Sequence, residues 1–436
     1  MIPSIKGTRD ILPPESDLFL EVEALAREVL QLYRFSEIRT PIFERTELFS
    51  RSVGEATDIV SKEMYTFSDR DDTSLTLRPE ATASVVRAYV AHRLWERASV
   101  TRLYYIGPMF RRERPQKGRY RQFSQIGAEV LGSPLPQVDY EVLEMLCTLL
   151  ERARITGWEL LLNSVGCSAD RPQYLAALRA KLEPVLPSLC GDCQRRAVTN
   201  PMRVLDCKVE EDQPIIAQLP TLDAYLCTEC RAHFAEVQCL LRGGGVPFTL
   251  APRLVRGLDY YTRTAFEFVQ SSLGGQNALL GGGRYDGLVE ALGGPKAAGA
   301  GIGFAIGEDR FVIALQAARE AAGVLPGGSA AFIAVPGVEQ QAAALALARE
   351  LRAAGLACEV GEAGRKLGRQ MELAARSQAR WALILGETEL NLGVVQVKRL
   401  ADGVQQTIPR SALIATLEAE ARETAAAANL KSAGRL

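Results

Sequence analysis

Residues 104–131 decide the fold that the sequence predicts. They consist of Tyr104-Tyr-Ile-Gly-Pro-Met-Phe-Arg111, an arginine-rich stretch, and Gln122-Phe-Ser-Gln-Ile-Gly-Ala-Glu-Val-Leu131. Both flanks have the apolar and aromatic composition of β-strands, whereas Pro115 and Gly118 between them interrupt helical periodicity and indicate a loop. We therefore expect two antiparallel arms of a sheet, an arrangement that supports a site on one sheet face.

The loop between these arms is strongly basic. From Arg111 to Arg121 it holds six basic residues and one acid, Glu113. The whole chain carries 51 Lys plus Arg against 52 Asp plus Glu, a formal net charge of −1, which argues against a protein that coats nucleic acid through overall charge. Any RNA binding would depend on local patches such as this loop, and the alternative for such a charge run is a solvated helix face.

Two further segments combine charged with apolar residues. The first is Leu254-Val-Arg-Gly-Leu-Asp-Tyr-Tyr-Thr-Arg-Thr264, whose closely spaced charges and phenols suit a buried ligand. The second is Gly301-Ile-Gly-Phe-Ala-Ile-Gly-Glu-Asp-Arg310. In chain order with the basic loop, they closely resemble the motifs of class II aminoacyl-tRNA synthetases, specifically the histidyl-tRNA synthetases. The similarity begins at Lys6-Gly-Thr-Arg-Asp-Ile-Leu-Pro13 and covers most of the chain.

The resemblance implies a histidine–tRNA ligase. Such an enzyme uses ATP to activate L-histidine to histidyl-adenylate and then transfers the aminoacyl group to tRNA(His), with Mg²⁺ accompanying the ATP. Two other functions stay open: a histidine-binding regulatory subunit of ATP phosphoribosyltransferase, which is a relative of this fold, and an RNA-binding module without catalysis. The regulatory relative typically lacks the C-terminal module and loses catalytic arginines, whereas this chain has both.

The chain is long enough for two or three domains, since it has 436 residues and single cores stop growing well below that length. We expect an α+β catalytic domain with a mixed, mainly antiparallel sheet, a helical insertion, and a C-terminal α/β domain of alternating strands and helices, similar to the family's anticodon-binding domain. The expected boundaries are residues 1–165 and 247–320 for the catalytic domain, 166–246 for the insertion, 321–328 for the linker, 329–423 for the anticodon-binding domain and 424–436 for a tail.

Three arginines are the expected catalytic residues. Activation brings a carboxylate to the α-phosphate of ATP, so cations must stabilise negative charge there, and a guanidinium binds such oxygens in bidentate fashion. The resemblance implies that Arg111 and Arg310 hold the ATP phosphates and that Arg256 lies by the α-phosphate and the substrate carboxylate. It also implies that Glu113 contacts the adenine and that Phe123 stacks on it.

The resemblance further implies a histidine pocket. Glu80, Thr82 and Gln125 would bind the amino group, while Glu129 and Tyr261 would hold the imidazole. The even spacing from Gln125 to Glu129 puts both side chains on one face of a strand. The remaining expected members and neighbours of the site are Ala81, Tyr260, Arg111 and Arg256 in the pocket, the run Gly281-Gly-Gly-Arg284-Tyr285-Asp286 in its wall, and Gln116 and Arg121 at the acceptor end of the tRNA.

Cysteines form a repeated pattern within the expected insertion. Cys190-Gly-Asp-Cys193 and Cys227-Thr-Glu-Cys230 are two CxxC pairs, with Cys207 between them. Two such pairs match a structural Zn²⁺ site with four cysteine ligands, and free reduced thiols are the alternative. The chain contains only two histidines, His92 and His233, so a histidine general base is not expected.

Apolar residues at helical spacing predict a helix from Glu15 to Leu32. The segment that follows, from Tyr33 to Glu44, resembles the class II dimer-interface motif, a helix and a strand that ends at Pro41. It implies a symmetric homodimer, although an ordinary helix–strand joint would look similar. The sequence has neither a signal peptide nor an apolar stretch long enough to span a bilayer. We therefore expect a cytoplasmic protein without a membrane partner.

Overall fold

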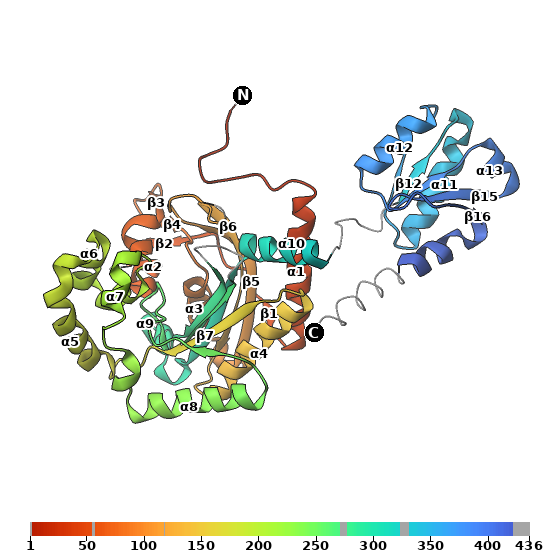
Figure 1. The fold of residues 1–436 in the computed structure, drawn as a ribbon. Coiled ribbons are helices and arrows are strands. Elements are labelled where there is room, and N and C mark those ends of the chain that lie inside the picture. Colours follow the sequence, from red (N-terminus) through yellow and green to blue (C-terminus); the bar gives the residue numbers. More distant parts are fainter. Residues whose placement is uncertain (1, 55–56, 117, 271–276, 323–330, 422–436) are drawn as a thin grey trace. The chain divides into compact units, whose positions relative to one another are not determined.

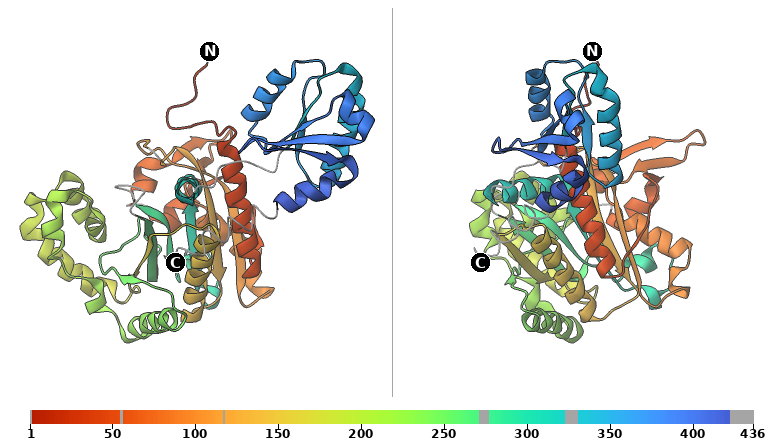
Figure 2. Two further views of the ribbon diagram at one scale, coloured as in Figure 1. Left: turned by 45° about the vertical axis from the view of Figure 1, so that its right-hand side comes forward. Right: turned by 90° about the vertical axis from the view of Figure 1, so that its right-hand side faces the viewer.

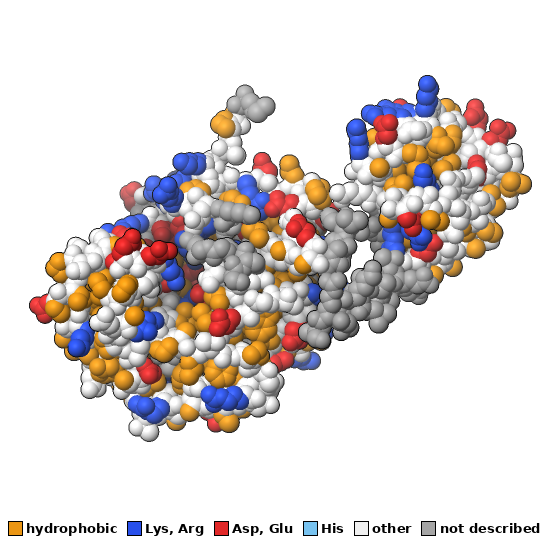
Figure 3. All heavy atoms as spheres, in the orientation of Figure 1, with side chains coloured by type: hydrophobic (Ala, Val, Ile, Leu, Met, Phe, Trp, Pro, Cys, Tyr) orange, Lys and Arg blue, Asp and Glu red, His pale blue; other side chains and the backbone are white. Residues whose placement is uncertain are grey.

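The structure is a computed structural model that describes residues 2–54, 57–116, 118–270, 277–322 and 331–421. The chain divides into two compact units, Met1–Ala318 and Arg319–Leu436 (Figure 1). None of the described helices combines the length and the apolar composition that a membrane span requires. On the face drawn in Figure 3, side chains of both charge signs are interspersed, in agreement with the near-zero net charge.

An eight-stranded sheet organises the first unit. Its six central strands, from β5 (Thr101–Phe110) to β7 (Trp158–Ser164), pair antiparallel. Its two edge strands, β1 (Ser36–Glu37) and β8 (Thr249–Leu250), pair parallel with their neighbours. The mixed, mainly antiparallel sheet expected from the sequence is therefore confirmed. In spatial order the strands are β1 (Ser36–Glu37), β5 (Thr101–Phe110), β6 (Gln122–Leu131), β11 (Gly301–Gly307), β10 (Ala278–Arg284), β9 (Thr262–Gln270), β7 (Trp158–Ser164) and β8 (Thr249–Leu250).

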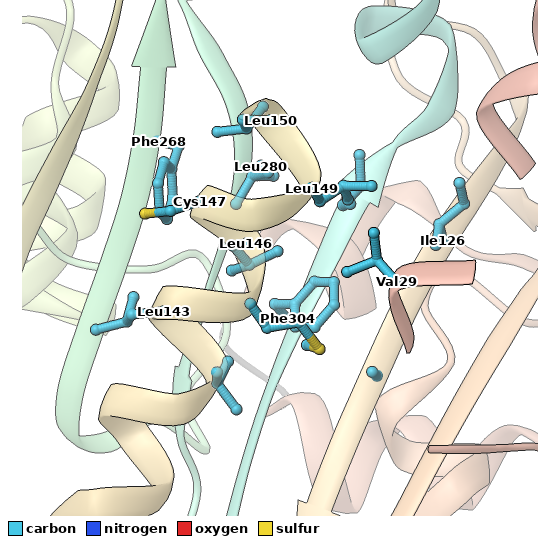
Figure 4. Packing of buried hydrophobic residues seen from close by; sticks show 14 of the residues in the cluster. Val29, Ile126, Leu143, Leu146, Cys147, Leu149, Leu150, Phe268, Leu280 and Phe304 are labelled. Atoms are coloured by element: carbon cyan, nitrogen blue, oxygen red, sulfur yellow. The ribbon is translucent and has the colours of Figure 1, made fainter. Parts of the chain in front are cut away.

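One face of this sheet is covered by helices α1 (Glu15–Leu32) and α4 (Pro136–Arg152). The helix α1 has the bounds that its apolar spacing predicts, because residues three and four apart form one buried stripe. Figure 4 shows Val29 of α1 and Leu146 of α4 packed near Phe304 of β11 and Ile126 of β6. This contact forms the main hydrophobic core of the unit.

The opposite face of the sheet is the polar one. Side chains of a strand alternate between faces, and on β6 the residues Ile126, Ala128 and Val130 belong to the helix-covered core. The odd-numbered residues, including Gln125 and Glu129, therefore lie on the other face. There α3 (Thr82–Ala91) packs against the strands through a second cluster that is rich in tyrosine.

Two smaller parts complete the first unit. Before α3, a three-stranded sheet is formed by β2 (Phe43–Arg45), β4 (Ser74–Leu77) and β3 (Tyr65–Ser68), beside α2 (Thr46–Val53). Between β7 and β8, the chain forms the helices α5 (Arg171–Leu182), α6 (Gly191–Thr199), α7 (Gln213–Ile216) and α8 (Thr228–Gly243). Both Figure 1 and Figure 2 show α5 and α6 to one side of the large sheet, in yellow-green.

The second unit is a small α/β domain, as expected. Helices α11 (Gln341–Ala353) and α12 (Leu367–Arg376) pack on opposite faces of its sheet, since Ile333 lies in the core with α11 and Phe332 in the core with α12. The sequence analysis did not predict the strand β16 (Gln405–Pro409) or the helix α13 (Glu387–Leu392). In spatial order the strands are β13 (Cys358–Val360), β12 (Ala331–Ala334), β14 (Trp381–Ile384), β15 (Val394–Arg399) and β16 (Gln405–Pro409).

The expected linker and tail fall largely on residues that the structure does not describe. Residues 323–328 of the linker lie outside the described residues, and α10 (Glu308–Ala322) extends through its first two positions. The expected tail, residues 424–436, lies wholly outside them.

Candidate active site

The three arginines that lie far apart in the sequence line one cavity. Arg111 follows β5, Arg256 precedes β9 and Arg310 lies in the first turn of α10. The cavity has a volume of about 170 Å³, and its wall also includes Glu113, Phe123 and Gln125. The structure therefore brings together the residues expected to bind ATP with Gln125 and Arg256, which are expected to bind the substrate.

Arg256 forms an ion pair with a carboxylate of the cavity wall. Its Nη1 lies 2.6 Å from Oε1 of Glu267, which also lines the cavity. Burial lowers the pKa of Arg256, but the Glu267 carboxylate and the adjacent Tyr261 hydroxyl outweigh it and hold the pKa above its ordinary value. The guanidinium lies over Gly281, where an added Cβ would approach Nη1 to 2.6 Å. A glycine at this position thus makes room for the charged group.

Arg111 lies above the ring of Phe123, with its Cζ 5.3 Å from the ring centroid. Its Nε donates a 2.8 Å hydrogen bond to the carbonyl of Pro79. Glu113 accepts from Nε of Arg119 at 2.6 Å. The aromatic ring of Phe123 and the carboxylate of Glu113 both line the cavity.

Arg310, in the first turn of α10, contacts the start of β10 and the basic loop. Its Nη1 donates to the carbonyl of Ala278 at 2.8 Å, and its Nε lies 3.4 Å from the carbonyl of Gly118. Burial lowers the pKa of Arg310. Because it is still a guanidinium, it stays charged at neutral pH.

Glu129 forms the centre of a second, fully buried polar cluster. Its carboxylate accepts a 2.7 Å hydrogen bond from the Thr82 hydroxyl and a 2.5 Å hydrogen bond from the Tyr285 hydroxyl. Burial raises the pKa of Glu129 to about 8, although both hydrogen bonds act in the opposite direction. Glu129 lies across Gly303 on the neighbouring strand, where any Cβ would collide with its carboxylate.

Tyrosines surround this carboxylate. The rings of Tyr260 and Tyr261 are 4.8 Å apart between centroids, and Tyr260 meets Tyr285 edge-on at 5.8 Å. Burial is the main reason that the pKa values of Tyr105 and Tyr260 lie well above 10. The tyrosine cluster adjoins the cavity at Tyr261, whose side chain contacts Arg256 of the cavity wall.

Glu80 has a task that the sequence did not predict. Its carboxylate accepts from the backbone N–H groups of Thr82 at 2.6 Å and Ala83 at 3.0 Å, and so it caps the N-terminus of α3. Ala81, the residue between, is fully buried. Glu80 and Ala81 therefore fix the entry into α3, from which Thr82 reaches Glu129.

Comparisons with known proteins identify the family. A model described as histidyl-tRNA synthetase matches residues 7–310, and one described as an anticodon-binding domain matches residues 329–420. The chain belongs to the histidyl-tRNA synthetase family. It is 55% identical over 424 residues to the histidine–tRNA ligase of Koribacter versatilis, covering 95% of each chain. It is 53% identical to that of Solibacter usitatus, covering 96% of this chain and 99% of the relative.

Solved structures agree with this assignment. The apo histidyl-tRNA synthetase of S. aureus is 38% identical, with a TM-score of 0.74 over 96% of this chain and 100% of that one. A Bacillus halodurans protein titled ATP phosphoribosyltransferase regulatory subunit/histidyl-tRNA synthetase is 23% identical, with a TM-score of 0.63 over 88% of this chain and 98% of that one. This second likeness concerns the fold alone.

The predicted zinc site is wrong in its ligand set. Cys190 and Cys193 do not meet Cys227 and Cys230, because each CxxC pair belongs to a different cluster. Each pair joins one further cysteine and one aspartate that are distant from it in the sequence. Neither added cysteine belongs to a CxxC pair of its own.

The wall of the histidine pocket also needs a correction. Arg284, expected there, is fully buried and forms an ion pair with Asp139 of α4, 2.6 Å between Nη2 and Oδ2. His233 lies 3.7 Å from the same aspartate, and burial lowers its pKa to about 4. His92 is exposed at the end of α3. Both histidines thus lack the position of a general base, as expected for this synthetase family.

The basic loop packs against the N-terminal segment. The backbone N–H of Arg121 donates to the carbonyl of Gly7 at 2.7 Å, and Nη1 of Arg121 donates to the carbonyl of Lys6 at 3.2 Å. Gln116 is exposed and forms a small bridge with Arg119. Glu267 is a site residue that the sequence analysis missed, and Tyr285, expected only as part of the pocket wall, donates to Glu129. A lone glutamate among the apolar residues of β9 was the available signal for Glu267.

Proposed function

We infer that the chain ligates histidine to tRNA, the activity of the family to which it belongs. In protein biosynthesis, this reaction forms histidyl-adenylate and pyrophosphate from L-histidine and ATP, and then transfers the aminoacyl group to the terminal ribose of tRNA(His). The convergence of Arg111, Arg256 and Arg310 on one cavity carries this proposal, because two anions must meet during activation and need cations aimed at the developing charge.

ATP would occupy the cavity with its base on Phe123 and its phosphates near Arg111 and Arg310. Glu113 would accept from the adenine amino group. Mg²⁺, a hard cation that binds carboxylate and phosphate oxygens, fits the carboxylates that line the cavity, of which Glu267 lies nearest to Arg256. The ion would neutralise phosphate charge there.

Histidine would enter beside the ATP. Its carboxylate would pair with Arg256, and its ammonium group would donate to Gln125, whose Oε1 is buried without a partner among the described residues. Glu129 and Tyr261 would hold the imidazole, with Glu80, Ala81, Thr82 and Tyr260 as supporting wall. A ligand without ring nitrogens would leave buried polar groups unpaired, which discriminates strongly against it.

Support for a homodimer comes from exposed apolar residues in the predicted interface segment and directly before it. Ile42 and Phe43 of the segment are 43% and 53% exposed, and Leu32, which precedes it, is 59% exposed. Exposed apolar residues of this kind are typical of an interaction surface. Gln116 and Arg121 in the basic loop would contact the acceptor end of the tRNA, and the second unit would bind the anticodon. We place the protein in the cytoplasm. Zn²⁺ would be a structural ion of the insertion, where the cysteine clusters lie.

The test is pyrophosphate exchange into ATP, measured with each of the twenty amino acids. We expect exchange with histidine alone, followed by charging of tRNA(His) and no other tRNA. Histidine binding without exchange, in folded protein supplied with Mg²⁺, would identify a regulatory subunit instead. Exchange with another amino acid would contradict the proposed pocket.

A further inference from the structure

Two clusters of cysteine and aspartate lie within the helical segment between β7 and β8. Cluster A consists of Cys167, Asp170, Cys227 and Cys230, and cluster B of Cys190, Cys193, Cys207 and Asp212. In each cluster the four sulfur and oxygen atoms all lie within 4.8 Å of one another. Three cysteines and one carboxylate thus converge twice, at points that are separate from each other and from the cavity.

The two clusters are built in the same way. Cys190 precedes α6 and Cys227 precedes α8, so each CxxC pair opens a helix at its N-terminus. The aspartate of each cluster accepts from the backbone N–H of that first cysteine, at 3.0 Å for Asp212 and at 2.8 Å for Asp170. Such hydrogen bonds orient a ligating carboxylate in metal sites. A repeated geometry of this kind is difficult to attribute to chance contacts.

The distances within cluster B fit a tetrahedral ion. Zn²⁺ with bonds of about 2.3 Å to sulfur and about 2.0 Å to oxygen places two sulfurs about 3.8 Å apart, and a sulfur and an oxygen about 3.5 Å apart. The Sγ atoms of Cys190 and Cys207 are 3.9 Å apart, and Sγ of Cys207 lies 3.3 Å from Oδ2 of Asp212. The backbone N–H of Val209 also points to the Cys207 sulfur, at 3.4 Å.

Disulfide bonds explain the two clusters less well than a bound metal ion does. Each cluster holds three cysteines, so any disulfide within it would leave one thiol and the carboxylate without a function. The two thiols of cluster B named above are also too far apart for a sulfur–sulfur bond, which measures about 2.05 Å. Four ligands of mixed sulfur and oxygen type instead saturate the tetrahedral shell of Zn²⁺.

The segment that holds the clusters has a small hydrophobic core. Its buried cluster counts Cys193, Cys207 and Cys230 among its members. Cluster B lies within the sequence span of cluster A, so cluster A joins the start of the segment, at Cys167, to the beginning of α8. Small domains with little core commonly depend on bound metal for their fold.

We propose that clusters A and B each bind one Zn²⁺ ion through three cysteine thiolates and one aspartate carboxylate. The ions are structural, because all four positions of each are filled by protein and no open position remains for a substrate. Each ion holds together parts of the helical segment that are distant in the sequence. This role does not require ATP, histidine or tRNA.

Metal analysis tests the proposal on the full-length protein, purified without chelator from cells supplied with zinc. We expect two equivalents of zinc per chain in the parent protein. Cys193→Ser and Cys230→Ser should each retain one equivalent, and the double variant none. The matched control is Cys239→Ser, an exposed cysteine of α8 outside both clusters, which should retain two. A parent content of one equivalent or less overturns the two-site proposal.

Cobalt substitution covers the case in which the serine variants fail to fold. Parent protein loaded with Co²⁺ should show tetrahedral d–d bands and sulfur-to-cobalt charge-transfer absorption that both saturate at two equivalents. Octahedral spectra, or saturation at one equivalent, would refute the proposal. Neither measurement depends on aminoacylation, so failure here leaves the proposed ligase activity untouched.

Discussion

Replacement of Glu129 by glutamine tests how much unfolding free energy is lost by placing an ionisable group in the proposed histidine pocket. Burial raises the pKa of Glu129 from 4.5 to about 8, so the folded protein binds this proton more tightly than the unfolded chain. The associated stability is fully present below pH 4.5 and is lost as the pH rises to about 8. At ~1.4 kcal/mol per pH unit, the loss amounts to about 5 kcal/mol.

Glu129→Gln removes this titration and keeps the shape of the side chain. Its amide can still accept from one hydroxyl and donate to the other, since Thr82 and Tyr285 can both reverse roles. The free energy of unfolding of the variant minus that of the parent should therefore increase between pH 5 and pH 8, by ~1.4 kcal/mol per pH unit, and then level off. Urea unfolding of both proteins across this range measures the difference.

The matched control is Glu159→Gln, at an exposed position of β7, which should leave the pH dependence unchanged. A constant stability difference between Glu129→Gln and the parent from pH 5 to pH 8 would refute the reasoning, because Glu129 would then be ionised in the folded protein throughout this range, as it is in the unfolded chain. In the same variant we expect histidine-dependent pyrophosphate exchange to fall by about 10²-fold or more, because the amide offers an unsuitable partner to the imidazole.

Three further predictions concern other parts of the structure. Arg256→Ala should lower pyrophosphate exchange by about 10²–10³-fold, with Arg256→Lys intermediate; exchange at the parental rate in Arg256→Ala would exclude its proposed role. Asp139→Asn should cost about 1.5–3 kcal/mol of unfolding free energy, because it removes charge-assisted hydrogen bonds of the buried Arg284 and leaves Asp286 as its ion-pair partner, and Asp139→Leu combined with Arg284→Met should cost less. Phe43→Glu should convert dimer to monomer in sedimentation velocity while Phe43→Tyr should not, and an unchanged dimer in Phe43→Glu would place the interface elsewhere.

Local periodicity was sufficient to predict much of the fold. The helix Glu15–Leu32 and the strand Gln122–Leu131 have the bounds that their apolar patterns indicate, because each buries one face against the same core. The strand β16 and the helix α13 were missed. At β16, Gln405-Gln-Thr-Ile-Pro409 contributes one buried side chain, so an edge strand of this kind leaves little hydrophobic pattern to detect.

The site was harder to predict where partners are distant in the sequence. Arg284 and Asp139 are 145 positions apart, and nothing local indicates that an arginine after three glycines turns into the core instead of the pocket. The same holds for the cysteines. Cys167-Ser-Ala-Asp170 repeats the spacing of a CxxC pair with an aspartate in the second position, and this was the available signal for cluster A.

In the proposed pocket, burial of Glu129 would provide specificity for histidine, but it also destabilises the ionised carboxylate. A carboxylate that selects a nitrogen ring must be dry, since water would satisfy it equally well and remove the discrimination. Dryness raises its pKa, and the fold offsets part of the penalty with the hydroxyls of Thr82 and Tyr285, which donate hydrogen bonds to the carboxylate. The two hydroxyls occupy two of the roughly four acceptor positions of the carboxylate, so an imidazole N–H could add a third hydrogen bond without displacing them. In the proposed pocket, histidine binding would therefore complete the hydrogen bonding of one buried carboxylate, and Gly303, which leaves the space for that carboxylate, would be as necessary as the groups that touch the substrate.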